Sequence, residues 1–589
     1  MLGSTAGLYV HKPPCEYHCP EAMPLIPRAS STVRTAGATA ALVAVIIAAP
    51  AMSSRGQGTA SSVLSATVGP RQAAWTRSFN PFRNDTDTRW PAWAGVYEPL
   101  VICNRTTGVF TPWLSTSYAW SADNLRLRFT VRPGVVWSDG VPFSARDVAF
   151  TFDLMHRFPA LDHDAVWQFL ADVAALDAHT VEFRWKRPYT PGVLYIGEQA
   201  IVAEHKWKDV AQPATFDDPS PVGTGPFVEV RRFEPTVYEL GRNKTYWQPG
   251  KPAIDVLRVR LYRSNDEIVR ALAADQVDWA SLFFPDIEKE WVAKDPAHHQ
   301  YWYPDSGPTV LLYVNTRQKP FDDRSVRKAL SMALDRPRIT KEAINGYALV
   351  ADATGLAESQ KRWKDPTLAN EGWTRRDLAA ASRLLDAAGL APGKDGIRAV
   401  PGAGAMRYTL QVVQGWTDWM AAAEIMRQNL AEIGVSVAVK AADYNGWDDS
   451  LRRGRFELSM GFGSRGPTPY EFYRGQMDGT VLRPVGERAD VNFHRFADPD
   501  AERLLRRLEA TSDAAETAAL TIDLERQFVQ NAPSIPLFIG PQWGVYNTTH
   551  VSGFPSRFRP YANAVPTGSP RGAFPSADSL PVLLEVKPR

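Results

Sequence analysis

Cysteine is scarce in this sequence: Cys15, Cys19 and Cys103 are the three cysteines among 589 residues. The first two lie in a segment that we expect to be absent from the mature protein, and the one remaining thiol cannot form an intramolecular disulfide. Nothing beside Cys103 suggests a nucleophile or a metal ligand. We therefore expect Cys103 to be a small buried apolar side chain.

An excess of charge of one sign is also lacking. The chain has 66 Lys and Arg against 64 Asp and Glu, so its net charge of +2 gives no field that would attract a phosphate backbone. RNP-like, zinc-finger and helix-turn-helix patterns do not occur, and nucleic acid is not an expected partner.

Catalytic signatures do not occur either: the sequence has no GxSxG, HExxH, Walker loop or zinc-spaced CxxC. Asp448 and Asp449 could be considered an acid–base pair, but adjacent side chains point apart on a helix or strand. The sequence therefore predicts no enzyme activity, no metal site and no cofactor.

Long apolar runs are confined to Ala36–Ala51, which follows Arg28 and Arg34. This run is shorter than the about 20 apolar residues that span a bilayer, and its Ala-Pro-Ala end is typical of signal-peptide cleavage. We expect residues 1–51 to be a signal region, with translation starting at Met23. Because no lipoprotein cysteine follows the run, a soluble periplasmic protein is predicted.

Tryptophan is abundant by contrast, with 19 residues in a chain long enough for two or three folding units. Period-two alternation predicts strands at 125–131 and 181–185, whereas helical spacing predicts helices at 145–156 and 167–175. Helices and strands continue to alternate to the end of the chain. This pattern indicates α/β lobes with partly parallel sheets.

Several short blocks resemble the family 5 extracellular solute-binding proteins, the peptide, nickel and oligosaccharide receptors of ABC importers. The blocks occur in the family's order and span nearly all of the mature chain: Tyr97–Leu100 (YEPL), Trp137–Thr151 (WSDGVPFSARDVAFT), Val222–Phe227 (VGTGPF), Asn243–Asp255 (NKTYWQPGKPAID), Val314–Arg336 and Ala380–Gly389. We expect the residues of these blocks mainly to maintain the fold. Ser144 is a plausible N-cap for the helix at 145–156, and Gly223 and Gly225 are expected to adopt φ values that other residues avoid.

The resemblance implies an α/β, two-lobed periplasmic binding protein fold of class II-like type, with a satellite domain and a ligand cleft between the lobes. Closure of the lobes would bury a small-molecule ligand and present a docking surface to the permease subunits of the transporter. The family also suggests a monomer. The predicted division is a disordered leader at 52–62, a first lobe at 63–100, 222–310 and 530–589, a satellite domain at 101–221 and a second lobe at 311–529.

The peptide receptors of this family hold the ligand ammonium with an aspartate in a motif similar to GWCADY. The comparable stretch here is Gly461–Gly466 (GFGSRG), in which Arg465 takes the place of the aspartate. A guanidinium opposite an ammonium is unfavourable, so either the usual peptide anchor is missing or this loop is re-routed and Arg465 faces solvent.

Tryptophan usage favours a sugar ligand, since an indole covers the apolar face of a pyranose. The predicted ligand is a β-gluco-oligosaccharide such as a cello-oligosaccharide; a peptide, a polysaccharide-degrading enzyme and a sensory subunit remain as alternatives. The residues expected in the cleft are Trp75, Asn80 and Trp93 from the first lobe, and Trp416, Trp419, Trp447 and Arg465 from the second.

Overall fold

The computed structural model describes residues 61–70, 74–83, 93, 95–464, 466–566 and 577–589. Residues 60–589 form one compact unit. The predicted signal region and most of the predicted leader lie outside the described residues, whereas Ser62 is held to Asp255 by hydrogen bonds of 3.0 Å. Within the part of the chain that the structure describes, no helix is long and apolar enough to cross a membrane.

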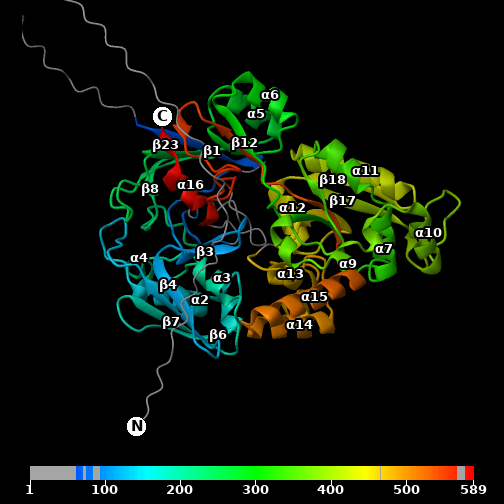
Figure 1. Ribbon diagram of the computed structural model, residues 1–589, viewed down its shortest axis with the longest axis horizontal. Helices are drawn as coiled ribbons and strands as arrows, with labels where there is room; N and C mark the ends of the chain where they lie inside the picture. Colours follow the sequence, from blue (N-terminus) through cyan, green and yellow to red (C-terminus); the bar gives the residue numbers. More distant parts are fainter. Residues whose placement is uncertain (1–60, 71–73, 84–92, 94, 465, 567–576) are drawn as a thin grey trace, which may run out of the picture. The chain divides into compact units, whose positions relative to one another are not determined.

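A seven-stranded sheet forms the first lobe and draws its strands from distant parts of the chain (Figure 1). β1 lies at its centre and pairs in parallel with β10 and β11, while the other pairs are antiparallel. In spatial order the strands are β12 (His299–Trp302), β21 (Gly544–Asn547), β11 (Trp279–Ser281), β1 (Val63–Pro70), β10 (Val256–Tyr262), β9 (Val237–Arg242) and β8 (Phe227–Glu234).

A six-stranded sheet forms the second lobe and is again mixed, because β17 runs parallel to both β18 and β19. All six residues of its β13 (TVLLYV) are buried, as expected of a strand covered on both faces. The spatial order is β14 (Leu349–Val350), β20 (Ile535–Ile539), β13 (Thr309–Val314), β19 (Leu458–Phe462), β17 (Arg407–Val413) and β18 (Ser436–Ala442).

A separate four-stranded antiparallel sheet lies within the predicted satellite segment 101–221. Its order is β4 (Ser115–Trp120), β5 (Arg126–Val131), β7 (Thr180–Trp185) and β6 (Leu170–Ala175), and α2 (Ala145–Arg157) packs on β6 and β7. The helix predicted at 167–175 is wrong: after a single 3₁₀ turn this segment is β6, because pairing with β7 overrides a short apolar spacing. The Ser144 cap of α2 is confirmed, as part of a capping box with Asp147.

The chain passes between the two large sheets twice, at residues 303–308 and at residues 540–543. The two crossings touch: Gly540 donates its N–H to the Pro308 carbonyl at 3.0 Å, and a Cβ on Gly307 would lie 1.8 Å from the Gly540 oxygen. The return crossing corrects the boundary predicted at residue 530. β20 belongs to the second sheet because its apolar run pairs with β13 and β14.

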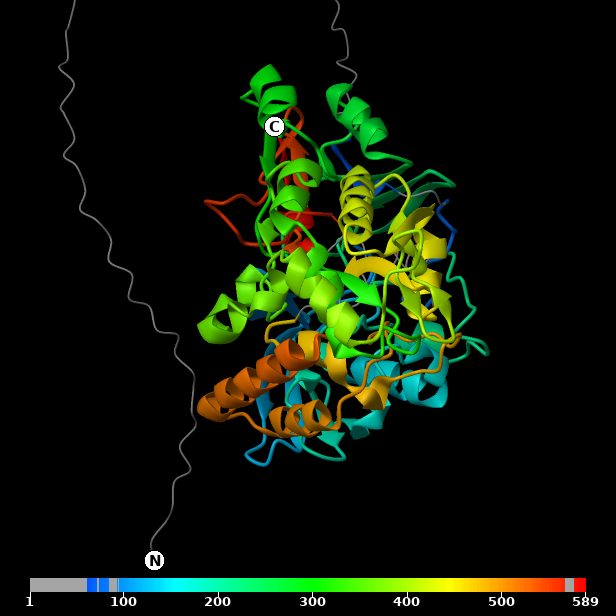
Figure 2. The same cartoon turned by 90° about the vertical axis from the view of Figure 1, so that its right-hand side faces the viewer.

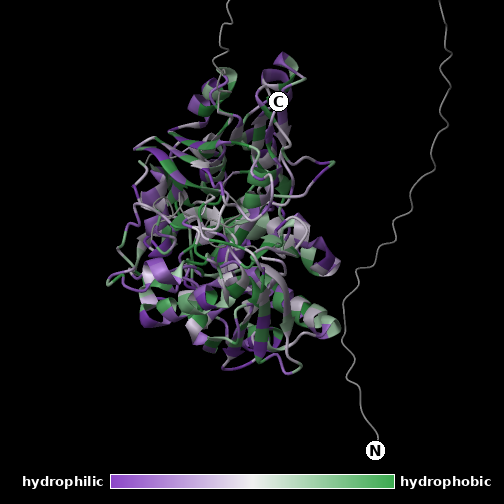
Figure 3. Cartoon of the chain, turned by 90° about the vertical axis from the view of Figure 1, so that its left-hand side faces the viewer, coloured by the Kyte–Doolittle hydropathy of each residue, from purple (hydrophilic) through white to green (hydrophobic). Residues whose placement is uncertain are grey.

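Amphipathic helices cover the second sheet. Figure 3, which views the molecule from the opposite side, shows hydrophilic and hydrophobic residues mixed along the helices that face the viewer. In Figure 1, α14 and α15 lie side by side and α13 packs against both. The helices of this lobe that matter below are α7 (Arg324–Ala333), α10 (Leu378–Ala387), α11 (Thr417–Ala431), α12 (Tyr444–Arg452), α13 (Tyr470–Met477), α14 (Pro499–Ala510) and α15 (Ala514–Asn531).

Gly223 and Gly225 are required by close packing, which corrects the reason given from the sequence. Neither is among the glycines with positive φ. A Cβ on Gly223 would lie 2.1 Å from the Val96 carbonyl oxygen, and one on Gly225 would lie 2.1 Å from that of Gly95. The predicted glycine turn is therefore a place where two backbone segments meet with no room for a side chain.

Glu98, from the YEPL block, is a fully buried carboxylate at the junction of the first lobe and the satellite segment. It accepts hydrogen bonds from Trp113 Nε1 (2.7 Å), the Tyr246 hydroxyl (2.7 Å) and Trp247 Nε1 (3.0 Å). Desolvation by burial raises the pKa of Glu98 to about 7, against the lowering effect of these donors. Glu98 of this block thus has a structural role, because its hydrogen bonds join segments that are distant in the sequence.

We expect the protein to be more stable at pH 5.5 than at pH 8.5. A carboxyl whose pKa rises from 4.5 in the unfolded chain to about 7 in the folded one binds an extra proton on folding between these values, so stability falls as the pH rises through 7. Burial raises the pKa of Asp418 to about 7 as well, with the same sign. Melting temperatures across this range test the expectation. Glu98→Gln should flatten the dependence, and a melting temperature that increases toward pH 8.5 contradicts it.

Candidate functional site

The carboxyl edges of the two large sheets face each other. Parallel strands β17, β18 and β19 all end at one edge of the second sheet, where Trp416 Nε1 donates to the carbonyl of Pro70 at the end of β1 (3.3 Å). Close by, Asn265 Nδ2 donates to Thr417 Oγ1 at 3.0 Å. Ligands of α/β folds bind beyond such strand ends.

The three second-lobe tryptophans predicted for the cleft come together in one aromatic cluster at this edge. Trp416 lies 5.0 Å from Trp419 and 6.2 Å from Trp447, measured between ring centroids, and Tyr444 and Phe462 complete the group. Trp419 and Trp447 are buried, and the latter donates to the Met460 carbonyl, whereas Trp416 is half-buried. The cluster is therefore mainly packing, with Trp416 and Phe462 as its half-buried members.

The three predicted first-lobe residues do not join that cluster. Trp75 is buried edge-on against Tyr238 at 5.3 Å, and the half-buried Trp93 donates to the Pro81 carbonyl. Asn80 is fully buried: both hydrogen bonds of its amide nitrogen go to backbone carbonyls, those of Pro213 and Phe216. The ligand roles of these side chains remain predictions, and Asn80 already has protein partners for its amide donors.

Arg465 lies outside the described residues, but both of its neighbours are described. Ser464 lines a cavity of about 80 Å³. One wall is His163–Ala165 with Gln168 and Tyr195, from the satellite segment; the other is second-lobe residues Ser464, Glu471, Arg474, Val481, Arg483 and Arg488–Val491. The seven residues predicted from sequence are not among its described lining.

The satellite wall is fixed against the second lobe by polar contacts. The Tyr189 and Tyr470 hydroxyls are 3.3 Å apart, and the Thr190 N–H donates to the Glu509 carbonyl at 2.8 Å. Arg187 forms a 2.6 Å ion pair with the Glu509 carboxylate. These contacts hold the two walls of the cavity together.

Helix α13 supplies two charged side chains to the cavity, and all eight of its residues are buried. Glu471 and Arg474 are three residues apart and hence on the same face of the helix. Arg474 Nε is buried and makes no hydrogen bond. Its ion-pair contact, with a carboxylate oxygen of Asp478, is 3.6 Å long. A buried donor of this kind is available for a ligand oxygen.

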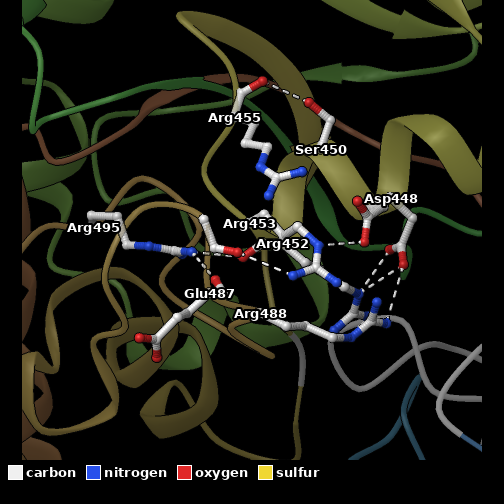
Figure 4. Close-up of polar contacts among 10 residues, drawn as sticks. Asp448, Ser450, Arg452, Arg453, Arg455, Glu487, Arg488 and Arg495 are labelled. Carbon is white, nitrogen blue, oxygen red and sulfur yellow. Dashed lines mark hydrogen bonds and ion pairs between the residues drawn. The ribbon is translucent and has the colours of Figure 1, made fainter.

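An ion-pair network supports the second-lobe wall from behind (Figure 4). Arg452, with no exposed side-chain surface, donates to both oxygens of Asp448 (2.9 and 2.8 Å) and to Asp490 (2.8 Å). Asp448 also receives Arg488 at 3.5 Å. Burial and the nearby Arg452 guanidinium lower the pKa of Arg488. The network thus places one carboxylate, Asp490, and one guanidinium, Arg488, on the cavity wall.

Asp448 and Asp449 pair with different arginines, as expected of adjacent residues on a helix. Asp449 accepts from Arg453 at 2.8 Å and takes no part in the contacts of Asp448. They form no acid–base pair. Among the described residues no group of three or more His, Cys, Asp or Glu side chains is arranged to hold a metal ion, and Cys103 is buried and unpaired.

Residues 109–481, more than half of the chain, match the model of the bacterial extracellular solute-binding proteins, family 5. The chain belongs to this family. The resemblance found in the sequence is therefore confirmed, as are the two-lobed α/β fold and the role of the family: a solute-binding component of an ABC importer that works in the periplasm or outside the cell.

Curated relatives of this family 5 protein include the glutathione-binding protein GsiB of Escherichia coli O1:K1, 26% identical over 460 residues, which are 72% of this chain and 80% of the relative. A mannohexaose-bound periplasmic oligopeptide-binding protein of Thermotoga maritima superposes with a TM-score of 0.80 at 23% identity, covering 90% of this chain and 99% of the other. DppA of Helicobacter pylori in complex with the peptide STSA gives 0.71 at 21% identity, covering 89% and 98%. These likenesses in structure establish the fold.

The cavity residues of α13 and of the loop after it are not among those predicted from the sequence. One signal was present: YEFYRGQM places Glu471 and Arg474 three residues apart, and they are the two charged residues of an aromatic-rich helix. Charged side chains at such positions are seldom buried unless they are paired or functional.

Proposed function

We propose that this chain captures a short peptide, or a peptide-like solute with a carboxylate, in the cavity between the satellite segment and the second lobe, and delivers it as a monomer to the permease of its importer. The observation that carries the proposal is the buried Arg474 Nε, which has no hydrogen-bond partner and lies 3.6 Å from an Asp478 oxygen, on a wall that also bears Arg488. Two guanidiniums suit a carboxylate, which they bind with charge-assisted hydrogen bonds.

The cavity also has carboxylates, on Asp164, Glu471 and Asp490. Charges of both signs suit a zwitterion, because a ligand ammonium finds a carboxylate even though Arg465 replaces the aspartate of the usual peptide motif. One water needs roughly 10–15 Å³ of such volume, so 80 Å³ accommodates the charged end of a ligand rather than several sugar rings. The glutathione specificity named for the curated relatives supports the same ligand class.

A second candidate is the cello-oligosaccharide predicted from the sequence. It is favoured by the half-buried Trp416 at the meeting point of the sheet edges, and by the oligosaccharide bound to the Thermotoga maritima protein. An indole at this point would stack on a pyranose face.

A thermal-shift screen of residues 60–589 separates the two ligand classes. We expect glutathione and di- to tetrapeptides to raise the melting temperature, while cello-oligosaccharides leave it unchanged. At a ligand concentration of about 100 times Kd, binding adds about 2.7 kcal/mol to the free energy of unfolding. The matched controls are the same peptides with a carboxamide in place of the C-terminal carboxylate, which should stabilise much less. Stabilisation by cello-oligosaccharides alone, lost in Trp416→Ala, would reverse the order of the candidates.

A further inference from the structure

A tight hairpin near the C-terminus presents the most exposed large apolar side chain among the described residues. Ser556 and Arg559 exchange backbone hydrogen bonds (3.2 and 3.0 Å), which leaves Arg557 and Phe558 as the two residues of the turn. Phe558 is 84% exposed. The red loop after β22 (Val551–Ser552) that contains this turn projects from the neighbouring strands in Figure 2.

Two arginines lie at the turn, and a lysine lies at the base of its loop. The Arg557 guanidinium lies 4.6 Å from the Phe558 ring centroid, and Arg559, whose guanidinium lies 4.8 Å from the Tyr561 ring centroid, forms a 2.6 Å ion pair with Glu585. The terminal strand β23 (Lys587–Pro588) pairs with β22 and so adds Lys587 beside the loop. Glu585, which also pairs with Lys251, is the carboxylate that these contacts bring to the patch.

An exposed aromatic ring near arginines and a lysine fits a lipid surface better than a protein partner. A protein partner normally covers about 800 Å² with an apolar centre, yet within the described part of residues 544–589 Phe558 is the one exposed large apolar side chain. A lipid surface requires only an aromatic anchor at headgroup level and cations opposite anionic headgroups.

We infer that the Arg557–Phe558 turn makes a peripheral, reversible contact with an anionic phospholipid surface. Phe558 enters the headgroup layer while Arg557 and Lys587 face the lipid phosphates. The contact lies outside the ligand cavity and does not depend on which solute the protein binds. It would retain an importer's binding protein near the membrane that contains its permease.

Co-sedimentation of residues 60–589 with sucrose-loaded vesicles tests this inference. We expect binding to phosphatidylcholine vesicles that contain phosphatidylglycerol, little binding to pure phosphatidylcholine, and weakening as salt rises. Phe558→Ala should lower the partition coefficient about tenfold, the factor expected for losing one anchoring aromatic ring, and Arg557→Gln should lower it by a smaller factor. Leu176→Ala is the matched control. Leu176 is an exposed apolar side chain (52%) on the satellite segment, and the six residues before it in the sequence include no Lys or Arg.

Equal binding of the wild-type protein to both kinds of vesicle overturns the inference, and so does unchanged binding of Phe558→Ala. Binding that appears only when the vesicles contain permease overturns it as well and assigns the turn to a protein contact. Thermal melting of each variant confirms that the fold is retained, as expected for changes at an exposed turn.

Discussion

Replacing Arg105 with Met is expected to lower the free energy of unfolding by about 3–5 kcal/mol, because it leaves the Glu198 carboxylate buried without its cation. Neither side chain has more than 2% exposed surface, and the pair is bidentate. Arg105 Nη1 also donates to the Cys103 carbonyl (3.1 Å), and Glu198 Oε1 accepts from the Cys103 N–H (2.8 Å). The pair therefore fixes β2 (Val101–Asn104), where the chain enters the satellite segment.

Urea denaturation followed by intrinsic fluorescence measures this effect. The double variant Arg105→Met/Glu198→Leu should recover most of the loss, since an apolar pair removes the unpaired charge. Arg184→Met is the matched control: Arg184 also pairs with a carboxylate, that of Asp172, but both are about half exposed, so its denaturation midpoint should hardly change. Equal losses for Arg105→Met and Arg184→Met would contradict the expectation.

Replacing Arg488 with Gln is expected to lower the affinity for a short peptide about ten- to a hundredfold. Loss of a fully buried charge partner would weaken binding by a larger factor. The expected effect is smaller here because the Arg488 side chain is 31% exposed and solvent partly screens its charge. The change leaves Arg452 to hold Asp448, so the fold should persist. Isothermal titration with the peptide that gives the largest thermal shift provides the measurement.

Arg453→Gln is the control for Arg488→Gln. Arg453 belongs to the same arginine-rich region and has a similar exposure of 35%, but it pairs with Asp449 and does not line the cavity. Its affinity should match that of the wild-type protein. Equal weakening in both variants would indicate a general electrostatic effect, and no weakening in Arg488→Gln would exclude this residue from the ligand site.

Much of the fold could be predicted because local pattern and family blocks agree. The strands at 125–131 and 181–185 were identified from alternation, and α2 from its spacing and its Ser144 cap. The errors arose where pairing with a distant segment determines the secondary structure or the sheet to which a strand belongs. β6 is a strand because it pairs with β7, and β20 joins the second sheet through partners more than 180 residues away.

The candidate site was harder to predict because one sequence does not show which side chains a cavity receives. Tryptophans at 416, 419 and 447 were expected to face a ligand, and they do cluster, but two of them are buried in the packing of the second lobe. The cavity depends instead on the meeting of the satellite segment with α13 and the loop after it. That encounter joins residues about 300 positions apart.

The strand order also restricts when the molecule can fold. β21, made of residues 544–547, lies between β12 and β11, and β20 lies between β14 and β13. Each large sheet therefore lacks an interior strand until more than nine-tenths of the polypeptide has been synthesised, and pairing over such long separations is slow. The late strands β20 and β21 thus complete both large sheets, and neither sheet can close before them.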